Sequence, residues 1–157
     1  LLHFAIAKNE FYLEYQPKYS LPNKQIVGVE VLLRWQSSQF GLVGPDEFIP
    51  IAEAAGLIPM ITEWVIQQAF IEFNRWGKPL ELAINISPRH LQGHHLVTLM
   101  QHMVEDQAID PRHIELEITE TAIMTHFEAA CQILNELHDM GFKIAIDDFG
   151  TGYSSLY

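Results

Sequence analysis

Four carboxylates and one carboxamide are the residues whose types and positions suggest chemistry: Glu30, Asn85, Glu117, Asp147 and Asp148. Each stands near the end of a segment with the composition of a β-strand. Carboxylates that gather in a site of low dielectric constant repel one another, so shared protons or bound divalent cations must offset the repulsion. Oxygen ligands of this kind suit Mg²⁺ and Mn²⁺. The adjacent Asp147 and Asp148 could hold two ions, which together activate water and stabilise an in-line displacement at phosphorus.

The elements that must position these side chains follow from the alternation of polar and apolar residues. Strands are predicted over residues 11–21, 25–35, 80–87, 113–119 and 143–148, with a turn at Pro22-Asn23 between the first two. Helices are predicted over residues 45–55, 61–76, 96–107 and 127–141, and residues 1–9 resemble the tail of a further helix. Residues 36–46, rich in Ser, Gly and Gln, are predicted to form a surface loop within a single domain.

The order of strands and helices is typical of parallel βα units with right-handed crossovers, either in an open doubly wound sheet or in a (β/α)8 barrel. A parallel sheet covered on both faces has strands that are apolar throughout. Here each strand has one apolar side and one polar side, as Leu116 and Glu117 illustrate. The polar sides would converge inside the mouth of a barrel, where the active sites of such barrels lie. The sequence therefore predicts an α/β fold, a (β/α)8 TIM-like barrel of which about the first five strands are present.

Several other polar residues have weaker signals. Glu115 shares the face of Glu117 and is expected to pair with an arginine or lysine inside the barrel, whereas Glu120 has the opposite parity and is expected where a helix begins. Gly150-Thr151-Gly152 could cradle a phosphate, but such a short motif is weak evidence and a plain flexible loop is favoured. His90 and His94 have the i, i+4 spacing of a zinc site, but Gly93 interrupts the segment, so both are predicted to be exposed to solvent.

Composition narrows the class of partner. The 157 residues suffice for one core, and the net charge of −11 argues against binding a nucleic acid polymer, which requires a basic surface. Divalent cations would still allow a small phosphorylated ligand to bind.

Cys131 is the single cysteine and there is no long apolar run or signal-peptide pattern, so a reducing, cytoplasmic location is expected. The full protein could still reach a membrane through other regions.

Six motifs in order along the chain resemble the EAL domain family of cyclic di-GMP phosphodiesterases. They are Tyr15-Gln16-Pro17, Glu30-Val31-Leu32-Leu33-Arg34-Trp35, Pro45 with Phe48-Ile49-Pro50 and Ala52-Glu53, Asn85-Ile86-Ser87, Glu115-Leu116-Glu117-Ile118-Thr119-Glu120, and Asp147-Asp148-Phe149-Gly150-Thr151-Gly152-Tyr153-Ser154-Ser155-Leu156. The resemblance covers essentially the whole chain.

The resemblance implies a metal-dependent hydrolase that converts cyclic di-GMP to linear pGpG in bacterial signalling. By matching position, metal ligands would be Glu30, Asn85, Glu117, Asp147 and Asp148, of which Glu30, Asp147 and Asp148 would be catalytic. Gln16 and Arg34 would contact the ligand, Arg34 through a guanidinium–phosphate fork. The resemblance also implies a homodimer of the complete domain and further regulatory domains.

Two features depart from the family pattern. Val31 stands where the signature tripeptide has alanine, but alternation points it toward the helices, so packing rather than ligation is affected. A whole barrel of this type needs about 250 residues and eight strands. Residues 1–157 are therefore expected to be the N-terminal part of the domain, inactive without the family's later Lys, Glu and Gln.

Three hypotheses remain open from the sequence. The first is an active phosphodiesterase completed by residues outside this chain, and it is favoured because a degenerate copy has no physical reason to keep a repulsive acidic cluster. The second is a non-catalytic EAL domain that binds cyclic di-GMP or another protein. The third is a different (β/α)8 metal-dependent hydrolase, which would explain the acidic mouth but not the six ordered motifs.

Overall fold

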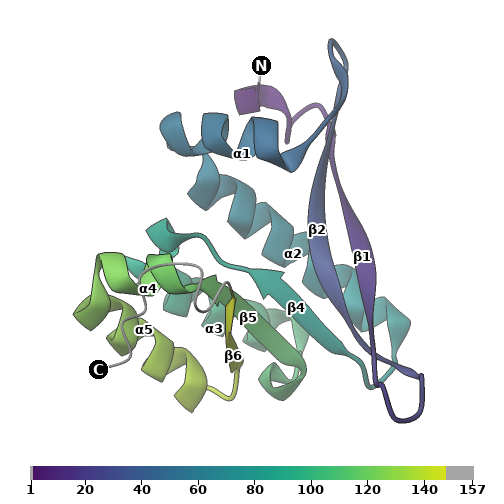
Figure 1. Ribbon diagram of the computed structural model, residues 1–157, viewed down its shortest axis with the longest axis vertical. Coiled ribbons are helices and arrows are strands. Elements are labelled where there is room, and N and C mark those ends of the chain that lie inside the picture. The colour runs from purple at the N-terminus through teal and green to yellow at the C-terminus, as the bar shows by residue number, and fades with distance from the viewer. Residues whose placement is uncertain (1, 148–157) are drawn as a thin grey trace.

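The computed structural model describes residues 2–147, with only the backbone described for Asp147, and shows one mixed sheet flanked by helices (Figure 1). The strands are β1 (Phe11–Tyr19), β2 (Ile26–Ser37), β3 (Gly41–Val43), β4 (Glu81–Asn85), β5 (Ile114–Thr119) and β6 (Lys143–Asp147). The α-helices are α1 (Pro45–Ala54), α2 (Ile58–Trp76), α3 (His95–Gln107), α4 (Glu120–Thr125) and α5 (Phe127–Asp139). Short 3-10 helices are η1 (Leu2–Phe4), η2 (Pro88–Leu91) and η3 (Pro111–His113).

The strands follow the spatial order β1-β2-β4-β5-β6. β1 and β2 form the predicted antiparallel hairpin, while β2, β4, β5 and β6 run parallel to one another. Each parallel connection contains at least one helix, as βα units require. The predicted succession of strands and helices is confirmed, and the parallel strands end on the same edge of the sheet.

The sheet divides at the middle of β2. One edge of β2 pairs with β1, and the other pairs first with β4 through Gly28–Glu30 and later with β3 through Trp35–Ser37. Over residues 31–34, this second edge has no strand partner among the described residues. The division leaves a gap in the sheet beside the ends of β4 and β5.

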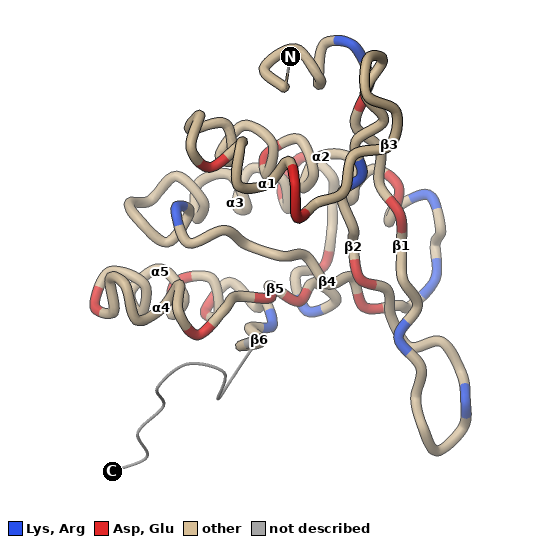
Figure 2. Tube along the Cα trace, turned by 45° about the horizontal axis from the view of Figure 1, so that its top comes forward, with Lys and Arg blue, Asp and Glu red and all other residues tan. Residues whose placement is uncertain are grey.

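The core lies between the sheet and the helices. Side chains of the predicted apolar parity are buried along three consecutive strands, where they pack with residues of the helices: Val29, Val31, Leu82, Ile84, Ile86, Leu116 and Ile118. The opposite parity carries the polar residues, and Figure 2 shows acidic positions along β1, β2 and β5. Ile146 differs from the other members of the apolar parity because it is 49% exposed on β6.

The polar face is concave. Lys18 on β1 contacts Glu115 and Glu117 on β5, although β2 and β4 lie between these strands. In a flat sheet, β1 and β5 would be three strand spacings apart, roughly 14 Å. Lys143 on β6 likewise pairs with Glu81 on β4, across β5. The contacts of Lys18 favour a curved sheet, as in a barrel wall, which agrees with the predicted TIM-like fold.

Two predictions for the first 46 residues are wrong. Residues 36–46 are not only a loop, because β3 pairs with the end of β2 and Val43 is buried. Glu10 holds this hairpin by accepting hydrogen bonds from Trp35 Nε1 at 3.0 Å and from Ser38 Oγ at 2.7 Å. The described residues of this segment, 2–9, contain only the 3-10 helix η1 followed by turns, and Asn9, with a positive φ of 53°, lies just before β1.

Candidate functional site

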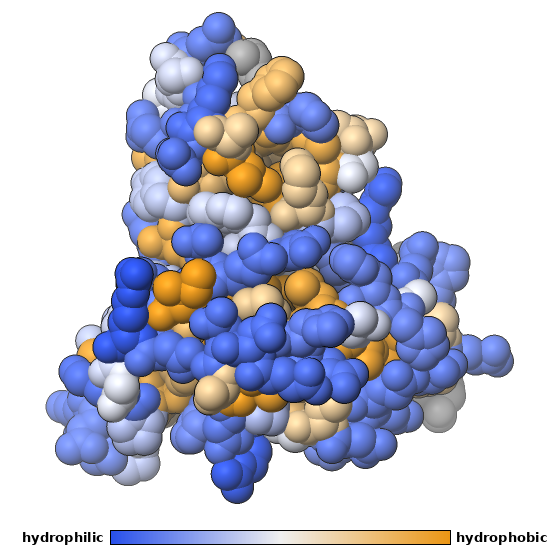
Figure 3. Space-filling view, turned by 180° about the vertical axis from the view of Figure 1, so that it is seen from behind, coloured by the Kyte–Doolittle hydropathy of each residue, from blue (hydrophilic) through white to orange (hydrophobic). Residues whose placement is uncertain are grey.

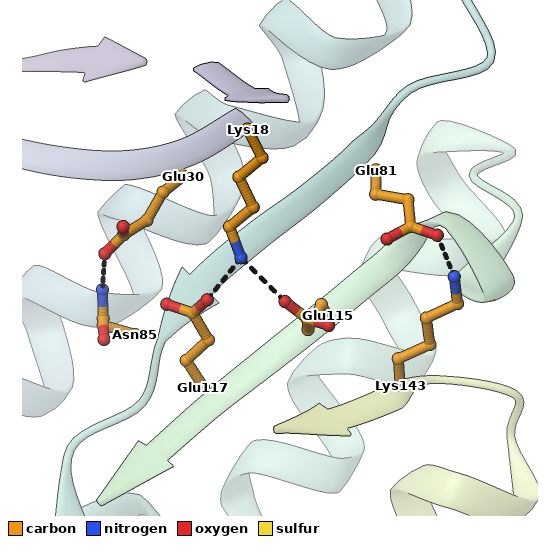
Figure 4. Close-up of polar contacts among 7 residues, drawn as sticks. All are labelled: Lys18, Glu30, Glu81, Asn85, Glu115, Glu117 and Lys143. Carbon is orange, nitrogen blue, oxygen red and sulfur yellow. Dashed lines mark hydrogen bonds and ion pairs between the residues drawn. The ribbon is translucent and has the colours of Figure 1, made fainter. Parts of the chain in front are cut away.

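Three of the predicted metal ligands lie together at the carboxyl end of the parallel strands. Asn85 and Glu117 are register partners on β4 and β5, and Glu30 lies on the other side of β4. Asn85 Nδ2 donates a hydrogen bond of 2.9 Å to Glu30 Oε1 (Figure 4). Burial raises the pKa of Glu117, and the charges of Glu30 and Glu115 raise it further, while Lys18 opposes the shift. The three side chains therefore form a group of oxygen donors that contains two neighbouring carboxylates.

Lys18 is the cation of this group. Its Nζ lies 2.6 Å from Glu117 Oε1 and 2.8 Å from Glu115 Oε1. Burial by itself would lower the pKa of Lys18, but the hydrogen bonds and charges of the two carboxylates raise it above its usual value. The expectation that Glu115 pairs with a basic residue inside the barrel is confirmed. The sequence did not predict Lys18 as this partner, although Lys18 lies on the same side of β1 as Glu14 and Gln16.

The two residues expected to contact a ligand lie on the hairpin. Arg34 is half-buried, and its Nε donates to Glu14 Oε2 at 2.8 Å while Nη1 donates to the Leu33 carbonyl at 3.1 Å. Gln16 faces Glu30 in the β1–β2 register and is exposed. Glu14 was not predicted to orient Arg34. Because Arg34 Nη2 has no hydrogen bond among the described residues, the guanidinium retains donors for an incoming anion.

A cavity of about 340 Å³ occupies the gap in the sheet. Residues 31–34 of β2 form one wall, the ends of β4 and β5 contribute Asn85 and Glu117, and α1 and α2 supply mainly apolar side chains. Arg34 and Glu53 add charges to the lining. This volume lies within the range of small-ligand pockets, which combine apolar walls with a few polar groups. The candidate metal ligands thus border a space large enough for an organic group.

A second cavity lies at the end of the molecule that carries the N-terminus. Apolar residues of η1, β3 and α1 line it, including Leu2, Leu42 and Ile51. Figure 3 shows hydrophobic residues gathered at this end, on a face that is otherwise mainly hydrophilic. The residues that line this cavity include none of the predicted metal ligands or ligand contacts. The first cavity is therefore the one that belongs to the candidate site.

The structure describes only part of the predicted aspartate pair Asp147-Asp148. The backbone of Asp147 ends β6 in register with Thr119, two residues beyond Glu117 toward the carboxyl edge, and its side chain is not described. Asp148 and Gly150-Thr151-Gly152 also lie outside the described residues. Among the side chains that the structure describes, no three of His, Cys, Asp or Glu form a metal-holding group. Two carboxylates and one amide are present, and this all-oxygen set fits the hard ions Mg²⁺ and Mn²⁺ rather than zinc.

The prediction that both His90 and His94 are exposed is wrong for His90. His90 is only 4% exposed, within η2, whereas His94 is exposed as expected. Burial lowers the pKa of His90, so its imidazole is favoured in the neutral form. The two residues do not share one exposed helical face, because η2 ends before Gly93 and α3 starts at His95.

The predicted position of Glu120 is confirmed, because α4 begins at this residue, with the Thr119 side chain as its N-cap.

No helix within residues 2–147 combines the length and the apolar character that crossing a membrane requires.

Comparison with known proteins identifies the class to which this fold and site belong. The EAL domain family model matches residues 2–157, and the chain belongs to this family. The resemblance to the EAL family and the TIM-like fold class are therefore confirmed.

Particular relatives then show which members the chain is similar to. It is 40% identical over 159 residues to the bifunctional diguanylate cyclase/cyclic di-GMP phosphodiesterase MucR of Pseudomonas aeruginosa, covering 99% of this chain and 23% of MucR. It is 38% identical over 155 residues to the cyclic di-GMP phosphodiesterase PA2567 of the same species, covering 96% of this chain and 26% of that protein. The chain thus spans about a quarter of the length of these curated relatives.

Among solved structures, the phosphodiesterase of MucR in complex with c-di-GMP superimposes with a TM-score of 0.92 at 40% identity, covering 98% of this chain and 64% of that one. The curvature and strand order described above therefore belong to the EAL fold and are not particular to this chain.

Proposed function

We propose that this chain is part of a phosphodiesterase that uses Mg²⁺ or Mn²⁺ to hydrolyse cyclic di-GMP to linear pGpG. The observation that carries the proposal is the grouping of Glu30, Asn85 and Glu117 beside an Arg34-lined cavity, in a chain of the EAL family. MucR and PA2567 are named as cyclic di-GMP phosphodiesterases, and the MucR domain was solved with c-di-GMP bound. The acidic group suits cations, and the neighbouring arginine suits a phosphate.

The residues have separable roles in this proposal. Glu30, Asn85 and Glu117, with Asp147 and Asp148, would hold the divalent ions, which supply Lewis-acid activation of water and of the phosphodiester. Glu30, Asp147 and Asp148 are the proposed catalytic residues.

Arg34 would bind a phosphate through the guanidinium donors that Glu14 leaves free, and Glu14 would keep the guanidinium in place. Gln16 would contact the ligand from the opposite strand of the hairpin. The apolar walls of the cavity would receive one base and exclude water from it.

We further propose that residues 1–157 are the N-terminal portion of a longer EAL domain and lack activity on their own. Support comes from the MucR phosphodiesterase, of which the aligned region covers only 64%. The catalytic Lys and the later Glu and Gln of the family would come from that remainder. Additional regulatory domains are proposed because the curated relatives are about four times as long as the matched region.

Hydrolysis of cyclic di-GMP by the full-length protein tests the proposal. Wild type should release pGpG when Mg²⁺ or Mn²⁺ is present, and Glu30→Ala should lower turnover by at least about a hundredfold, because metal catalysis contributes several kcal/mol. Glu81→Gln is the matched control, since Glu81 lies on the same concave face but pairs with Lys143 away from the site. Unchanged turnover in Glu30→Ala would refute the catalytic role. Tight binding of cyclic di-GMP by wild type without hydrolysis would identify a receptor instead.

A further inference from the structure

Lys18 reaches its two partners across two other strands. Its Cα is the register partner of Gly28 on β2, and the next strand, β4, carries Ala83 between Glu30 and Glu115. Neither residue has a side chain longer than a methyl group, so the aliphatic part of Lys18 can pass over both strands. Figure 4 shows Lys18 lying across β4 with its ammonium between the two carboxylates. Gly28 and Ala83 thus leave room on the concave face for the long side chain of Lys18.

The Lys18 ammonium engages only one oxygen of Glu117. The bond of 2.6 Å goes to Oε1, and no described hydrogen bond engages Oε2. A carboxylate with one oxygen fixed by a charged donor is restricted in rotation, and its second oxygen then has a defined direction. Glu117 and Asn85 are register partners on neighbouring strands. The direction of Glu117 Oε2 therefore decides whether it can share a cation with Asn85.

We propose that Lys18 is a positioning residue that holds Glu117 in the orientation required to bind a divalent cation. The proposal rests on the proposed function, because it concerns the same metal site. Lys18 does not contact the substrate or the cation itself. It acts through Glu117, as outer hydrogen-bonding partners of metal ligands commonly do.

Glu115 explains why a cation is needed at this position. Glu115 and Glu117 lie two residues apart on the same side of β5, so their side chains are neighbours of like charge. Lys18 bonds to both at once and offsets their repulsion. Without Lys18, repulsion from Glu115 and from Glu30 would move the Glu117 carboxylate away from the orientation seen here. The loss of orientation outweighs the weaker repulsion that the removal of a positive charge would bring to a bound cation.

The other lysine of the concave face provides a matched control. Lys143 also crosses a strand to bond to a carboxylate, Glu81, and its side chain is 45% exposed, close to the 36% of Lys18. Its partner is not among the proposed metal ligands. Replacement of Lys143 therefore removes the same charge and a comparable ion pair from the same face without touching Glu117.

The test is Mn²⁺ affinity, measured by isothermal titration calorimetry on the full-length protein without substrate. Lys18→Met should weaken Mn²⁺ binding by about tenfold or more, as is usual when an outer partner of a ligand is lost. Lys18→Arg should restore most of the affinity because it keeps the cation, and Lys143→Met should bind Mn²⁺ as wild type does. Unchanged or tighter binding in Lys18→Met would overturn the proposal, as would equal losses in the two Met variants.

Folding is checked separately by circular dichroism and thermal unfolding without metal. A purely structural Lys18 would lower the unfolding temperature and leave the affinity of the folded protein unchanged. If Lys18→Met does not fold, Lys18→Gln, which keeps a donor but no charge, carries the same test with the same outcomes. Failure of the proposed function would look different, because wild type itself would then neither bind Mn²⁺ nor hydrolyse cyclic di-GMP.

Discussion

Side chains of β5 point alternately to the two faces of the sheet, and the residues on the two faces differ in polarity and burial. Ile114, Leu116 and Ile118 face the helices and are at most 1% exposed, whereas Glu115 and Glu117 face the concave side and are half-buried and charged. The backbone is the same for both sets, and only the direction of the side chains distinguishes them. One strand thus supplies the core with its apolar side and the candidate site with its polar side.

This difference separates stability from chemistry within single strands. Burial of the apolar side chains contributes most of the favourable free energy of folding. The polar side opposes folding, because partly buried like charges repel, and Lys18 and Lys143 reduce that cost. Substitutions on the two faces should therefore change different measurements, and adjacent residues allow a direct comparison.

The largest effect on stability is expected from the apolar side of β5. Leu116→Ala should lower the free energy of unfolding by about 2–5 kcal/mol, because it leaves a cavity in a fully buried position. Denaturant unfolding of the full-length protein measures this loss. Leu134→Ala is the comparison, because Leu134 packs only partly buried against the same core and should cost less. Equal losses for the two variants would contradict the assignment of Leu116 to the centre of the core.

At Gly28, on the concave face, the space between β2 and β4 limits the size of the side chain that the fold accepts. A Cβ added there would lie 2.7 Å from the Glu81 carbonyl oxygen, so β2 and β4 would have to separate. Gly28→Ala should cost about 1–3 kcal/mol of unfolding free energy, as is typical of overpacking. Gly44→Ala is the control and should cost less, because its φ of −70° suits alanine and nothing lies within 4 Å of the added atom, which leaves only the small cost of alanine at the N-cap of α1. A wild-type stability for Gly28→Ala would show that the strands tolerate the separation.

Glu117→Gln tests the polar side of the same strand. The change preserves size and removes the charge, so Mn²⁺ affinity should fall by about tenfold, equal to about 1.4 kcal/mol. Stability should not fall with it, since the substitution also relieves repulsion from Glu30 and Glu115. Calorimetric titration and thermal unfolding measure the two quantities. Wild-type affinity for Mn²⁺ would exclude Glu117 as a ligand.

The smallest expected effect is a pH dependence at Glu10, a buried carboxylate outside the site. Hydrogen bonds from the Ser38 side chain and from Trp35 hold the pKa of Glu10 below its usual value, the opposite of the direction for Glu117. A lowered pKa in the folded state adds stability above the unfolded pKa of about 4.3, and that stability disappears as the pH falls through the folded pKa.

Thermal unfolding midpoints recorded from pH 6 to about pH 3 check the Glu10 prediction. Glu10→Gln should have a lower midpoint than wild type at pH 6, and the difference should shrink as the pH falls. A constant difference over the whole range would mean that ionisation of Glu10 contributes nothing to the stability of the β2–β3 hairpin. Buried Glu10 and half-buried Glu117 thus differ in their surroundings: hydrogen-bond donors surround Glu10, whereas Glu117 has the acidic neighbours Glu30 and Glu115 beside Lys18.

Much of this architecture could be predicted from the sequence. The alternation of side chains along residues 80–87, 113–119 and 143–148 was enough to assign the strands and their two faces, because the side-chain period of a strand is a local property. Helix ends were similarly local: the helix predicted to end at residue 76 does end at Trp76, where Gly77 follows with a φ of 56° as the C-cap of α2. The convergence of Glu30, Asn85 and Glu117 followed from parallel strands that end on one edge.

Only the tertiary structure decided the contacts between distant segments. The partner of Glu115 and Glu117 is 97 and 99 residues away in the chain and becomes a neighbour through the curvature of the sheet. The pairing of β3 with β2, the burial of His90 and the cavity beside Arg34 also depend on how separate segments pack. Local patterns specify which way a side chain points, whereas the group that it meets depends on the three-dimensional path of the whole chain.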